Sequence, residues 1–225
     1  MEIGGGKGWP SDVRVVFYHK AHGLICIGTE SGALYIFGDG FQYMRPWLKE
    51  STNPVCSIVA LGANKLLIAF ADNSLAMMGL PTLNMIDILE GSWLTSRASD
   101  VTITFLHVDE PGERLYAYVG TSEGSFFVLD LQQPTIRLCD YSVTWAEAGL
   151  SHSMALVEIQ ICPKDERYIA LGYDGPTVAA GAVVIYDLVK RKVYRQYPTA
   201  AITTLAWSHT GECLYAGKQQ LFHKF

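Results

Sequence analysis

A strand, a tight turn and a second strand are written twice in this chain, and the repeat constrains the fold more than any other feature. The first copy, at residues 28–38, reads GTESGALYIFG, and the second, at residues 120–130, reads GTSEGSFFVLD. Self-similarity of this kind is typical of architectures that repeat one supersecondary unit, because a single unit cannot bury its apolar face alone. Further copies are therefore expected along the chain.

Five such units follow one another, approximately at residues 8–50, 51–95, 96–150, 151–198 and, incomplete, 199–225. Each opens with an alternating strand, passes a polar turn, runs into a short apolar strand and turns at a Gly or Asn. The alternating positions are Val13, Val15 and Phe17; Val55, Ser57 and Val59; Val101, Ile103 and Phe105; Leu156, Glu158 and Gln160; and Ile202, Thr204 and Ala206.

The spacing of the units predicts a WD40-like β-propeller. Aligned turn positions step by 41 and 51 residues, at Gly32, Asn73 and Gly124. Glycines of the apolar strands step by 52 and 45 residues, at Gly120, Gly172 and Gly217. These steps bracket the period of about 40 to 45 residues of WD40 blades. The predicted fold is all-β, with four and a half to five blades of an incomplete ring. Seven blades would need about 300 residues, so we expect a truncated chain.

Three further segments have predicted places in this scheme. Residues 138–145 alternate well and are expected to form an outer strand, with a connecting loop over 146–153. A second outer strand is expected over 192–197, and residues 173–181 are expected to lengthen the hairpin of the fourth unit.

Composition excludes several classes of partner and site. The formal net charge is -5, which does not suit neutralisation of nucleic-acid phosphates or of an anionic membrane. No apolar run approaches the roughly 20 residues of a membrane helix, and residues 1–10 lack the apolar core of a secretory signal. We expect a soluble, cytoplasmic protein without a nucleic-acid partner. The cysteines are widely spaced and are expected to be reduced and structural: Cys26, Cys56, Cys139, Cys162 and Cys213.

Two patterns resemble ligand sites superficially. Residues 4–8, GGGKG, resemble a phosphate-binding loop, but Gly8 follows Lys7 where that loop has Ser or Thr, and Pro10 comes soon after. His19 and His22 could hold a metal only if a Cys, Asp or Glu converged on them. A solvated turn is the favoured interpretation of the two histidines.

No residues group into a catalytic constellation in the sequence. Residues 151–153, Ser-His-Ser, and the carboxylates Asp109 and Glu110 are expected in loops, without a nucleophile, base and orienting acid together. A propeller enzyme would place such groups around its central channel. We therefore expect no enzyme, no cofactor and no metal, and we assign no catalytic, cofactor-binding or metal-binding residue. The partner-binding residues remain unknown.

Charged residues near the predicted hairpin ends have structural interpretations. Residues 190–192, Lys-Arg-Lys, with Arg195 form the one basic cluster, and a solvated hairpin is favoured over a binding patch. Asp130 and Asp187 occupy the position of the aspartate in the WD dipeptide, but Leu129 and Tyr186 precede them instead of Trp. The propeller is therefore expected to be divergent.

An ordered series of motifs resembles the first propeller of lethal giant larvae, tomosyn and their fungal relatives. It begins with GWPS at residues 8–11 and the turn and strand at 21–38, although Trp9 stands where the family has Phe. The likeness continues through residues 69–75, 118–124, 184–188 and 205–211. No one of these motifs is decisive, but together they cover nearly the whole chain in order.

The resemblance implies a cytosolic, peripherally membrane-associated protein of two tandem propellers, without catalysis. Such a protein binds syntaxin-type SNARE proteins of the plasma membrane and regulates vesicle docking, exocytosis and cell polarity. This chain would correspond to about five blades of the first propeller, without the second propeller, the phosphorylated loop or the SNARE-like tail of that family. The repeat alone also allows a general WD40 adaptor in a trafficking or ubiquitin-ligase complex.

Overall fold

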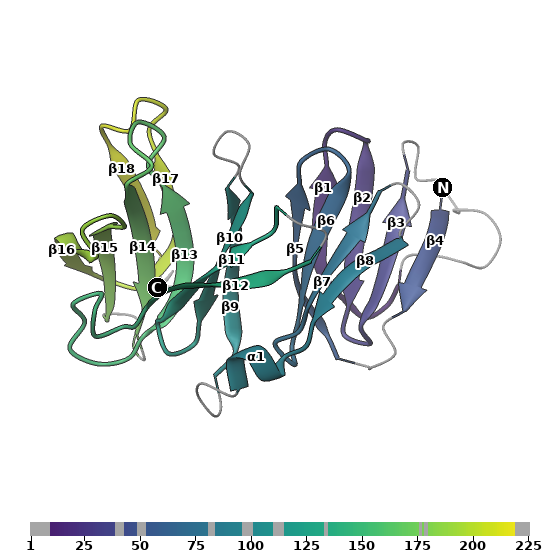
Figure 1. The fold of residues 1–225 in the computed structure, drawn as a ribbon, viewed down its shortest axis with the longest axis horizontal. Coiled ribbons are helices and arrows are strands. Elements are labelled where there is room, and N and C mark those ends of the chain that lie inside the picture. The colour runs from purple at the N-terminus through teal and green to yellow at the C-terminus, as the bar shows by residue number, and fades with distance from the viewer. Residues whose placement is uncertain are drawn as a thin grey trace, which may run out of the picture. The chain divides into compact units, whose positions relative to one another are not determined.

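The computed structural model describes residues 10–38, 43–48, 53–80, 84–95, 101–109, 115–132, 135–175, 177 and 180–218. The chain divides into two compact units, residues 1–94 and 95–225. In both, the described strands form antiparallel sheets in which neighbours in sequence are neighbours in space (Figure 1). The all-β prediction is confirmed.

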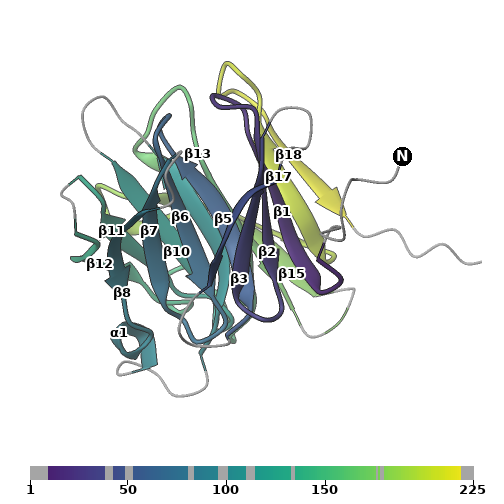
Figure 2. The ribbon, with the colours of Figure 1, turned by 90° about the vertical axis from the view of Figure 1, so that its right-hand side faces the viewer.

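The first unit contains two four-stranded sheets. Sheet 1 consists of β1 (Val13–His19), β2 (Leu24–Thr29), β3 (Ala33–Phe37) and β4 (Tyr43–Leu48). Sheet 2 consists of β5 (Val55–Leu61), β6 (Lys65–Phe70), β7 (Leu75–Gly79) and β8 (Asn84–Leu89), and the short helix α1 (Ser92–Thr95) follows it. Apolar side chains of both sheets share one buried cluster, so the two sheets pack face to face (Figure 2).

The second unit contains two four-stranded sheets and, among the described residues, one sheet of two strands. Sheet 3 consists of β9 (Ile103–Asp109), β10 (Tyr116–Thr121), β11 (Phe126–Asp130) and β12 (Arg137–Val143). Sheet 4 consists of β13 (Ala155–Ile161), β14 (Tyr168–Asp174), β15 (Gly181–Asp187) and β16 (Lys192–Thr199). Sheet 5 consists of β17 (Ile202–Trp207) and β18 (Leu214–Lys218).

The repeated Gly-Thr-x-x-Gly letters encode a hairpin turn closed by a threonine side chain. Thr29 Oγ1 accepts a hydrogen bond from Ala33 N at 2.9 Å, and Thr121 Oγ1 accepts one from Ser125 N at 3.1 Å. The glycine between them has positive φ in both turns, +79° at Gly32 and +88° at Gly124. A side chain is disfavoured in this conformation, which explains why the letters recur.

The matching turn of sheet 2 reaches the same shape with different residues. Asn73 takes φ +64° in place of glycine, and Asn is the non-glycine residue best suited to this region. The carboxylate of Asp72 accepts a hydrogen bond from the backbone N–H of Ser74 at 3.1 Å. The three turn positions aligned in the sequence are therefore confirmed as three left-handed residues.

The opening strand of every sheet is interrupted, which corrects the predicted alternation. Its register against the second strand shifts near the start, as at Val55/Ser57 in β5 and Leu156/Glu158 in β13. Ile58 rather than Val59 is consequently buried in β5. An extra residue in one strand leaves a bulge and moves the following side chains to the other face. The same shift lies at Val13/Val15 in β1, Ile103/Phe105 in β9 and Ile202/Thr204 in β17.

Small residues stand opposite each interruption, and three of them receive a side chain of the next sheet within their unit. The residues at this position of the second strands are Gly28, Ala69, Gly120, Gly172 and Gly217. A Cβ added at Gly28 would lie 2.6 Å from Val55 Cβ, one at Gly120 would lie 3.0 Å from Leu156 Cγ, and one at Gly172 would lie 3.3 Å from Ile202 Cγ2. We call each such glycine with its docked side chain a glycine notch.

Three remaining predictions concern sheets 3 and 4. The outer strands expected over 138–145 and 192–197 are confirmed as β12 and β16, and residues 144–154 connect sheets 3 and 4. The hairpin extension is confirmed as well. Tyr173 pairs with Ala182 and Asp174 with Gly181, so the ends of the segment 173–181 lengthen strands β14 and β15.

Candidate protein-binding groove

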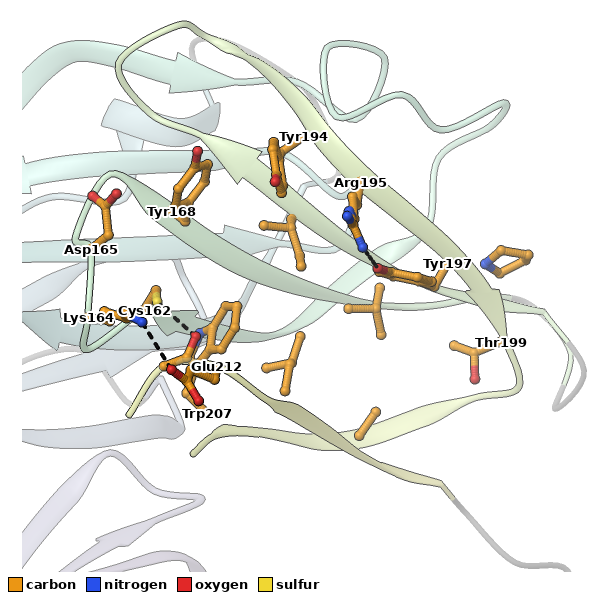
Figure 3. Close-up of a pocket in the computed structure, with 16 residues that line it drawn as sticks. Cys162, Lys164, Asp165, Tyr168, Tyr194, Arg195, Tyr197, Thr199, Trp207 and Glu212 are labelled. Carbon is orange, nitrogen blue, oxygen red and sulfur yellow. Dashed lines mark hydrogen bonds and ion pairs between the residues drawn. The ribbon is translucent and has the colours of Figure 1, made fainter. Parts of the chain in front are cut away.

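A groove of about 810 Å³ opens in the second unit between sheets 4 and 5 (Figure 3). Its apolar lining comes from Val183 and Ile185 of β15 and from Leu214 and Ala216 of β18. In a strand, residues two apart point to the same face. Both strands therefore present one apolar row to the groove.

Aromatic side chains form the wall on the side of β16. The rings of Tyr168 and Tyr194 lie with their centroids 4.9 Å apart. The guanidinium of Arg195 lies over the Tyr194 ring at 5.6 Å and donates to the hydroxyl of Tyr197 at 3.4 Å (Figure 3). Tyr194 is 53% and Tyr197 45% exposed. Tyrosine and arginine in this setting are typical of protein-binding surfaces.

The opposite wall is fixed by contacts between sheets 4 and 5. Trp207 of β17 donates its indole N–H to the backbone oxygen of Gln160 at 3.1 Å. Lys164 forms an ion pair with Glu212 at 3.1 Å, with both side chains exposed. An exposed pair of this kind contributes little to stability, so its main effect is to add two charged groups to the lining of the groove.

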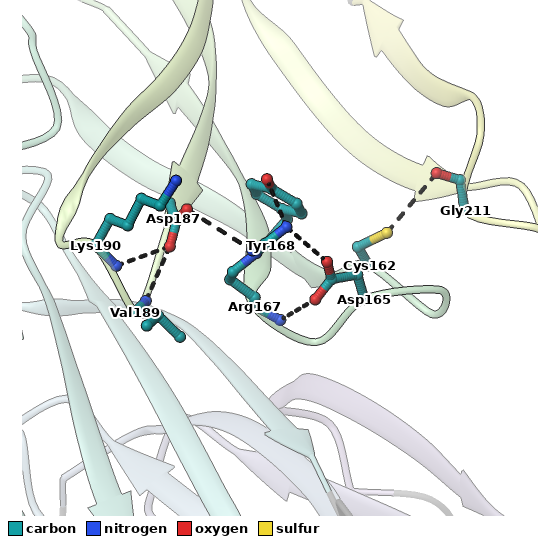
Figure 4. Close-up of polar contacts among 8 residues, drawn as sticks. All are labelled: Cys162, Asp165, Arg167, Tyr168, Asp187, Val189, Lys190 and Gly211. Atoms are coloured by element: carbon teal, nitrogen blue, oxygen red, sulfur yellow. Dashed lines mark hydrogen bonds and ion pairs between the residues drawn. The ribbon is translucent and has the colours of Figure 1, made fainter.

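A polar cluster on the turn before β14 holds the base of the aromatic wall (Figure 4). Arg167 forms an ion pair with Asp165 at 3.0 Å and donates to the hydroxyl of Tyr168 at 2.8 Å. Its guanidinium also lies over the ring of Tyr168, 4.5 Å from the centroid. The orientation of Tyr168 in the groove is therefore fixed from behind by Arg167.

The aspartates in the WD position close turns, as a carboxylate does when it accepts from the backbone two residues on. Asp130 accepts from Gln132 N at 2.9 Å. Asp187 is 2% exposed and accepts from Val189 N at 3.0 Å and Lys190 N at 2.8 Å. Its other oxygen lies 4.0 Å from Arg167 Nε. The turn after β15 is thereby tied to the polar cluster behind the groove.

The basic residues of the β15–β16 hairpin separate into two environments. Arg191 lies over the ring of Tyr141 in β12, 4.6 Å from the centroid, and the Tyr141 hydroxyl donates to Leu188 O at 2.8 Å. This packing joins sheet 3 to sheet 4, and burial raises the pKa of Tyr141 to about 12. Arg195 instead lines the groove. Lys190, Arg191, Lys192 and Arg195 are all exposed, as the solvated-hairpin interpretation expects.

His19 corrects the prediction of a solvated turn. It is the last residue of β1 and only 2% exposed. Its ring stacks on that of His22 with centroids 5.3 Å apart, and His22 lies 3.2 Å from the side-chain oxygen of Asn64. His19 is buried because its side chain lies on the inward face of β1. The polar residues around it in the sequence did not indicate this. In the described ranges, no three His, Cys, Asp or Glu residues are grouped as a metal ion would require.

The other candidate residues have ordinary surroundings or lie outside the description. Ser151 Oγ and His152 Nδ1 are 3.0 Å apart on an exposed loop. Asp109 is the last residue of β9 rather than part of a loop, while Glu110 and residues 4–8 lie outside the described residues. All five cysteines are free, and burial raises the pKa of Cys26 to about 12. No helix in the described part combines the length and apolar character of a membrane span.

The groove itself was missed by sequence reasoning, although one signal was present. Residues 194–197 read Tyr-Arg-Gln-Tyr within a predicted outer strand. Large aromatic residues on the outermost strand of a sheet have little to pack against unless a partner covers them. That signal pointed to a surface patch, but the residues of sheet 5 that complete the groove come from the tertiary structure.

Comparisons with known proteins agree with this architecture. No family model matches the chain. The human LLGL scribble cell polarity complex component 2 is 27% identical over 229 residues, and the mouse protein of that name is 28% identical over 227 residues. Both alignments cover 92% of this chain and 21% of the relative, so the chain spans about a fifth of the length of these relatives.

Solved β-propellers share the fold at low sequence identity. The Cps50 (Swd1) propeller domain of Myceliophteria thermophila superimposes with a TM-score of 0.63 at 16% identity, over 93% of this chain and 62% of that chain. The Dos1 propeller superimposes with a TM-score of 0.67 at 10% identity, over 91% and 52%. The predicted propeller class is thus confirmed, and in sequence the chain is similar to a lethal giant larvae-type protein over part of that protein's length.

Proposed function

We propose that this chain is a non-catalytic protein-interaction scaffold that acts in a cell polarity complex. The observation that carries the proposal is the groove of sheet 4, whose wall of Tyr168, Tyr194, Arg195 and Tyr197 has the composition of protein-binding surfaces. The similarity to a protein named as a component of the scribble cell polarity complex supports the choice of complex.

We further propose that syntaxin-type SNARE proteins of the plasma membrane are among the partners. The motif series shared with lethal giant larvae and tomosyn supports this assignment, together with a role in exocytosis at the cytoplasmic face of that membrane. The net charge of -5 makes attachment through a protein partner a better fit than direct attraction to anionic lipid.

A binding experiment with purified chain tests both parts. Immobilised chain is incubated with the cytoplasmic domain of a plasma-membrane syntaxin, and separately with an epithelial lysate probed for Scribble. We expect both proteins to be retained. The double substitution Tyr194→Ala and Tyr197→Ala should weaken retention at least tenfold for whichever of the two proteins binds in the groove. Exposed tyrosines at the centre of an interface commonly dominate its affinity.

Tyr18→Ala is the matched control, because Tyr18 is a 60% exposed tyrosine of β1 in the other unit. It should leave retention unchanged. Failure to retain either protein would refute the polarity and SNARE assignments. Retention of ubiquitin-ligase or trafficking-coat subunits in their place would establish the general adaptor function instead.

A further inference from the structure

We propose that Glu158 makes the contact between sheets 4 and 5 sensitive to protons. Sheet 5 is held more tightly when this carboxyl group is neutral and less tightly when it is ionised. This property is independent of the proposed scaffold function. Three features carry it: the place of Glu158 in the repeat, the polar groups around its carboxyl group, and the lack of a cation on the described strands packed against it.

Glu158 occupies a position that none of the other described sheets fills with an ionisable residue. It follows the interruption in β13 and pairs with Gly172. The equivalent residues of the other first strands are two apolar and two hydroxyl side chains, namely Val15, Ser57, Phe105 and Thr204. The fold of a sheet therefore does not require a carboxyl group at this position.

The position places the side chain of Glu158 between the two sheets. Glu158 is only 9% exposed. A Cβ added at Gly172 would lie 3.2 Å from Glu158 Cβ, 3.1 Å from Leu205 Cδ1 and 3.3 Å from Ile202 Cγ2. Leu205 and Ile202 belong to β17 and are buried in the apolar cluster that joins the two sheets. Glu158 therefore begins beside the glycine notch at which sheet 5 docks.

Polar groups of β13 and β17 surround the carboxyl group. Gln160 Nε2 donates to Glu158 Oε1 at 2.9 Å. The backbone N–H of Leu205 and the hydroxyl of Thr204, both on β17, favour the charged form of Glu158. The backbone oxygen of Gln160 accepts the indole N–H of Trp207 at 3.1 Å. Glu158 and Gln160 together therefore interact with β17 from its third residue to its last.

Both side-chain neighbours can serve either protonation state of the carboxyl group. A hydroxyl donates and accepts, and a side-chain amide carries both a donor and an acceptor. Thr204 and Gln160 can donate to the carboxylate and, after rotation about their terminal bonds, accept from the neutral acid. Neutralisation of Glu158 therefore removes a buried charge without leaving an unpaired polar group.

The strands around Glu158 supply no lysine or arginine to compensate its charge. β9, β10, β14 and β17 pack against β13, and none of these five described strands contains either residue. Their other titratable residues are His107, Asp109, Tyr116, Tyr118, Tyr168, Tyr173 and Asp174. Burial consequently outweighs the hydrogen bonds and raises the pKa of Glu158, because a carboxylate is disfavoured where water is excluded.

The direction of the pH effect follows from the raised pKa. The closed junction binds the proton more tightly than the open one, so a fall in pH favours the closed junction. This stabilisation is complete below the ordinary glutamate pKa of 4.5 and is lost as the pH rises through the pKa in the folded state. His107 on β9 has the opposite sign, since burial lowers its pKa.

Hydrogen exchange of β17 tests the proposal. The measurements use the His107→Gln background, which removes the opposing titration. Protection factors of the amides of residues 202–207, corrected for the intrinsic pH dependence of exchange, are compared at pH 7.5 and pH 5. We expect protection to rise at least threefold at the lower pH. The rise should be larger in β17 than in β11 of sheet 3, because it concerns one junction.

Three variants identify the responsible group. Glu158→Gln keeps nearly the same shape without the charge, so β17 should be equally protected at both pH values. Glu158→Ser, which copies Ser57 of the equivalent position in β5, is a second charge-free variant and should behave likewise. Glu166→Gln is the matched control, because Glu166 is an exposed glutamate on the turn before β14. It should keep the full pH response.

Three results would overturn the proposal: protection of β17 that does not change with pH, a pH response that persists in the charge-free variants, or a response that is lost in Glu166→Gln. An equal rise in β11 would also overturn it, by assigning the effect to the whole unit. Circular dichroism melting identifies any variant that fails to fold. Retention of partner proteins tests the scaffold function separately.

Discussion

Adding one methyl group at Gly28 should destabilise the first unit, because the glycine notch leaves no room for it. A Cβ at this position would contact Val55 Cγ1 severely and would lie 2.6 Å from Val55 Cβ and 2.7 Å from Val15 Cγ1. Val55 is completely buried. The contact is with the branch point of a β-branched side chain, which has few alternative rotamers. Relief therefore requires movement of one sheet against the other.

Two opposing contributions determine the magnitude for Gly28→Ala. Overpacking of a well-packed core costs about 1 to 3 kcal/mol, and contacts this short place the site at the upper end. Replacing glycine by alanine in a strand recovers about 0.5 to 1 kcal/mol of backbone entropy. The net loss should be about 2 kcal/mol, which for a chain of this size lowers the melting temperature by about 4 to 8 °C.

Thermal melting followed by circular dichroism measures the change, and two further variants test the cause. Ala69→Gly makes the reverse change at the equivalent position of β6 and should cost about 1 kcal/mol. In the double variant Gly28→Ala with Val55→Ala, part of the clash disappears. Its loss of unfolding free energy should therefore be about 1 kcal/mol smaller than the sum of the two single losses. A neutral or stabilising Gly28→Ala, or strict additivity with Val55→Ala, would refute the notch.

Three further changes have defined outcomes. Thr121→Val removes the side-chain hydrogen bonds to Ser125 and should cost about 1 to 2 kcal/mol; urea unfolding measures it, and an unchanged midpoint would contradict the turn analysis. Asp187→Ala removes the acceptor of two backbone N–H groups and should cost about 2 kcal/mol in the same assay. Burial lowers the pKa of His107 from 6.5, so the imidazole is protonated more readily in the unfolded state than in the folded state. The contribution of neutral His107 to the free energy of unfolding is complete above about pH 6.5, and it is lost as the pH falls from there toward the pKa in the folded state. His107→Gln should flatten the loss between pH 7 and 5.5 in melting curves, and an identical slope would exclude the assignment.

The turns were predictable from sequence because their chemistry is local. A residue with positive φ must be Gly or Asn with few exceptions, so Gly32, Asn73 and Gly124 could be aligned before any packing was known. The strands around them follow from apolar runs bounded by these turns. Local rules of this kind are sufficient for the all-β class and for the order of the sheets.

Features that depend on packing between sheets were not predictable in the same way. The interruption in β5 places Ile58 instead of Val59 in the core. The alternation of apolar and polar residues in the sequence cannot show by itself where the extra residue of the strand lies. His19 has a polar side chain beside a polar turn, yet β1 directs it inward. The groove depends on Ile185, whose exposure is set by a strand that is distant in sequence.

The glycine notch has a consequence for how such a chain can change during evolution. Within the second unit the notches at Gly120 and Gly172 are 52 residues apart, more than the period of about 40 to 45 residues of WD40 blades, and each still receives a side chain of the next sheet. Residues gained or lost in the loops between notches need not disturb the stacking, because neighbouring sheets are aligned by buried side-chain contacts, the notch among them, and not by loop length. Connecting loops are therefore free to diversify, and new partners can be recruited there at little risk to the fold.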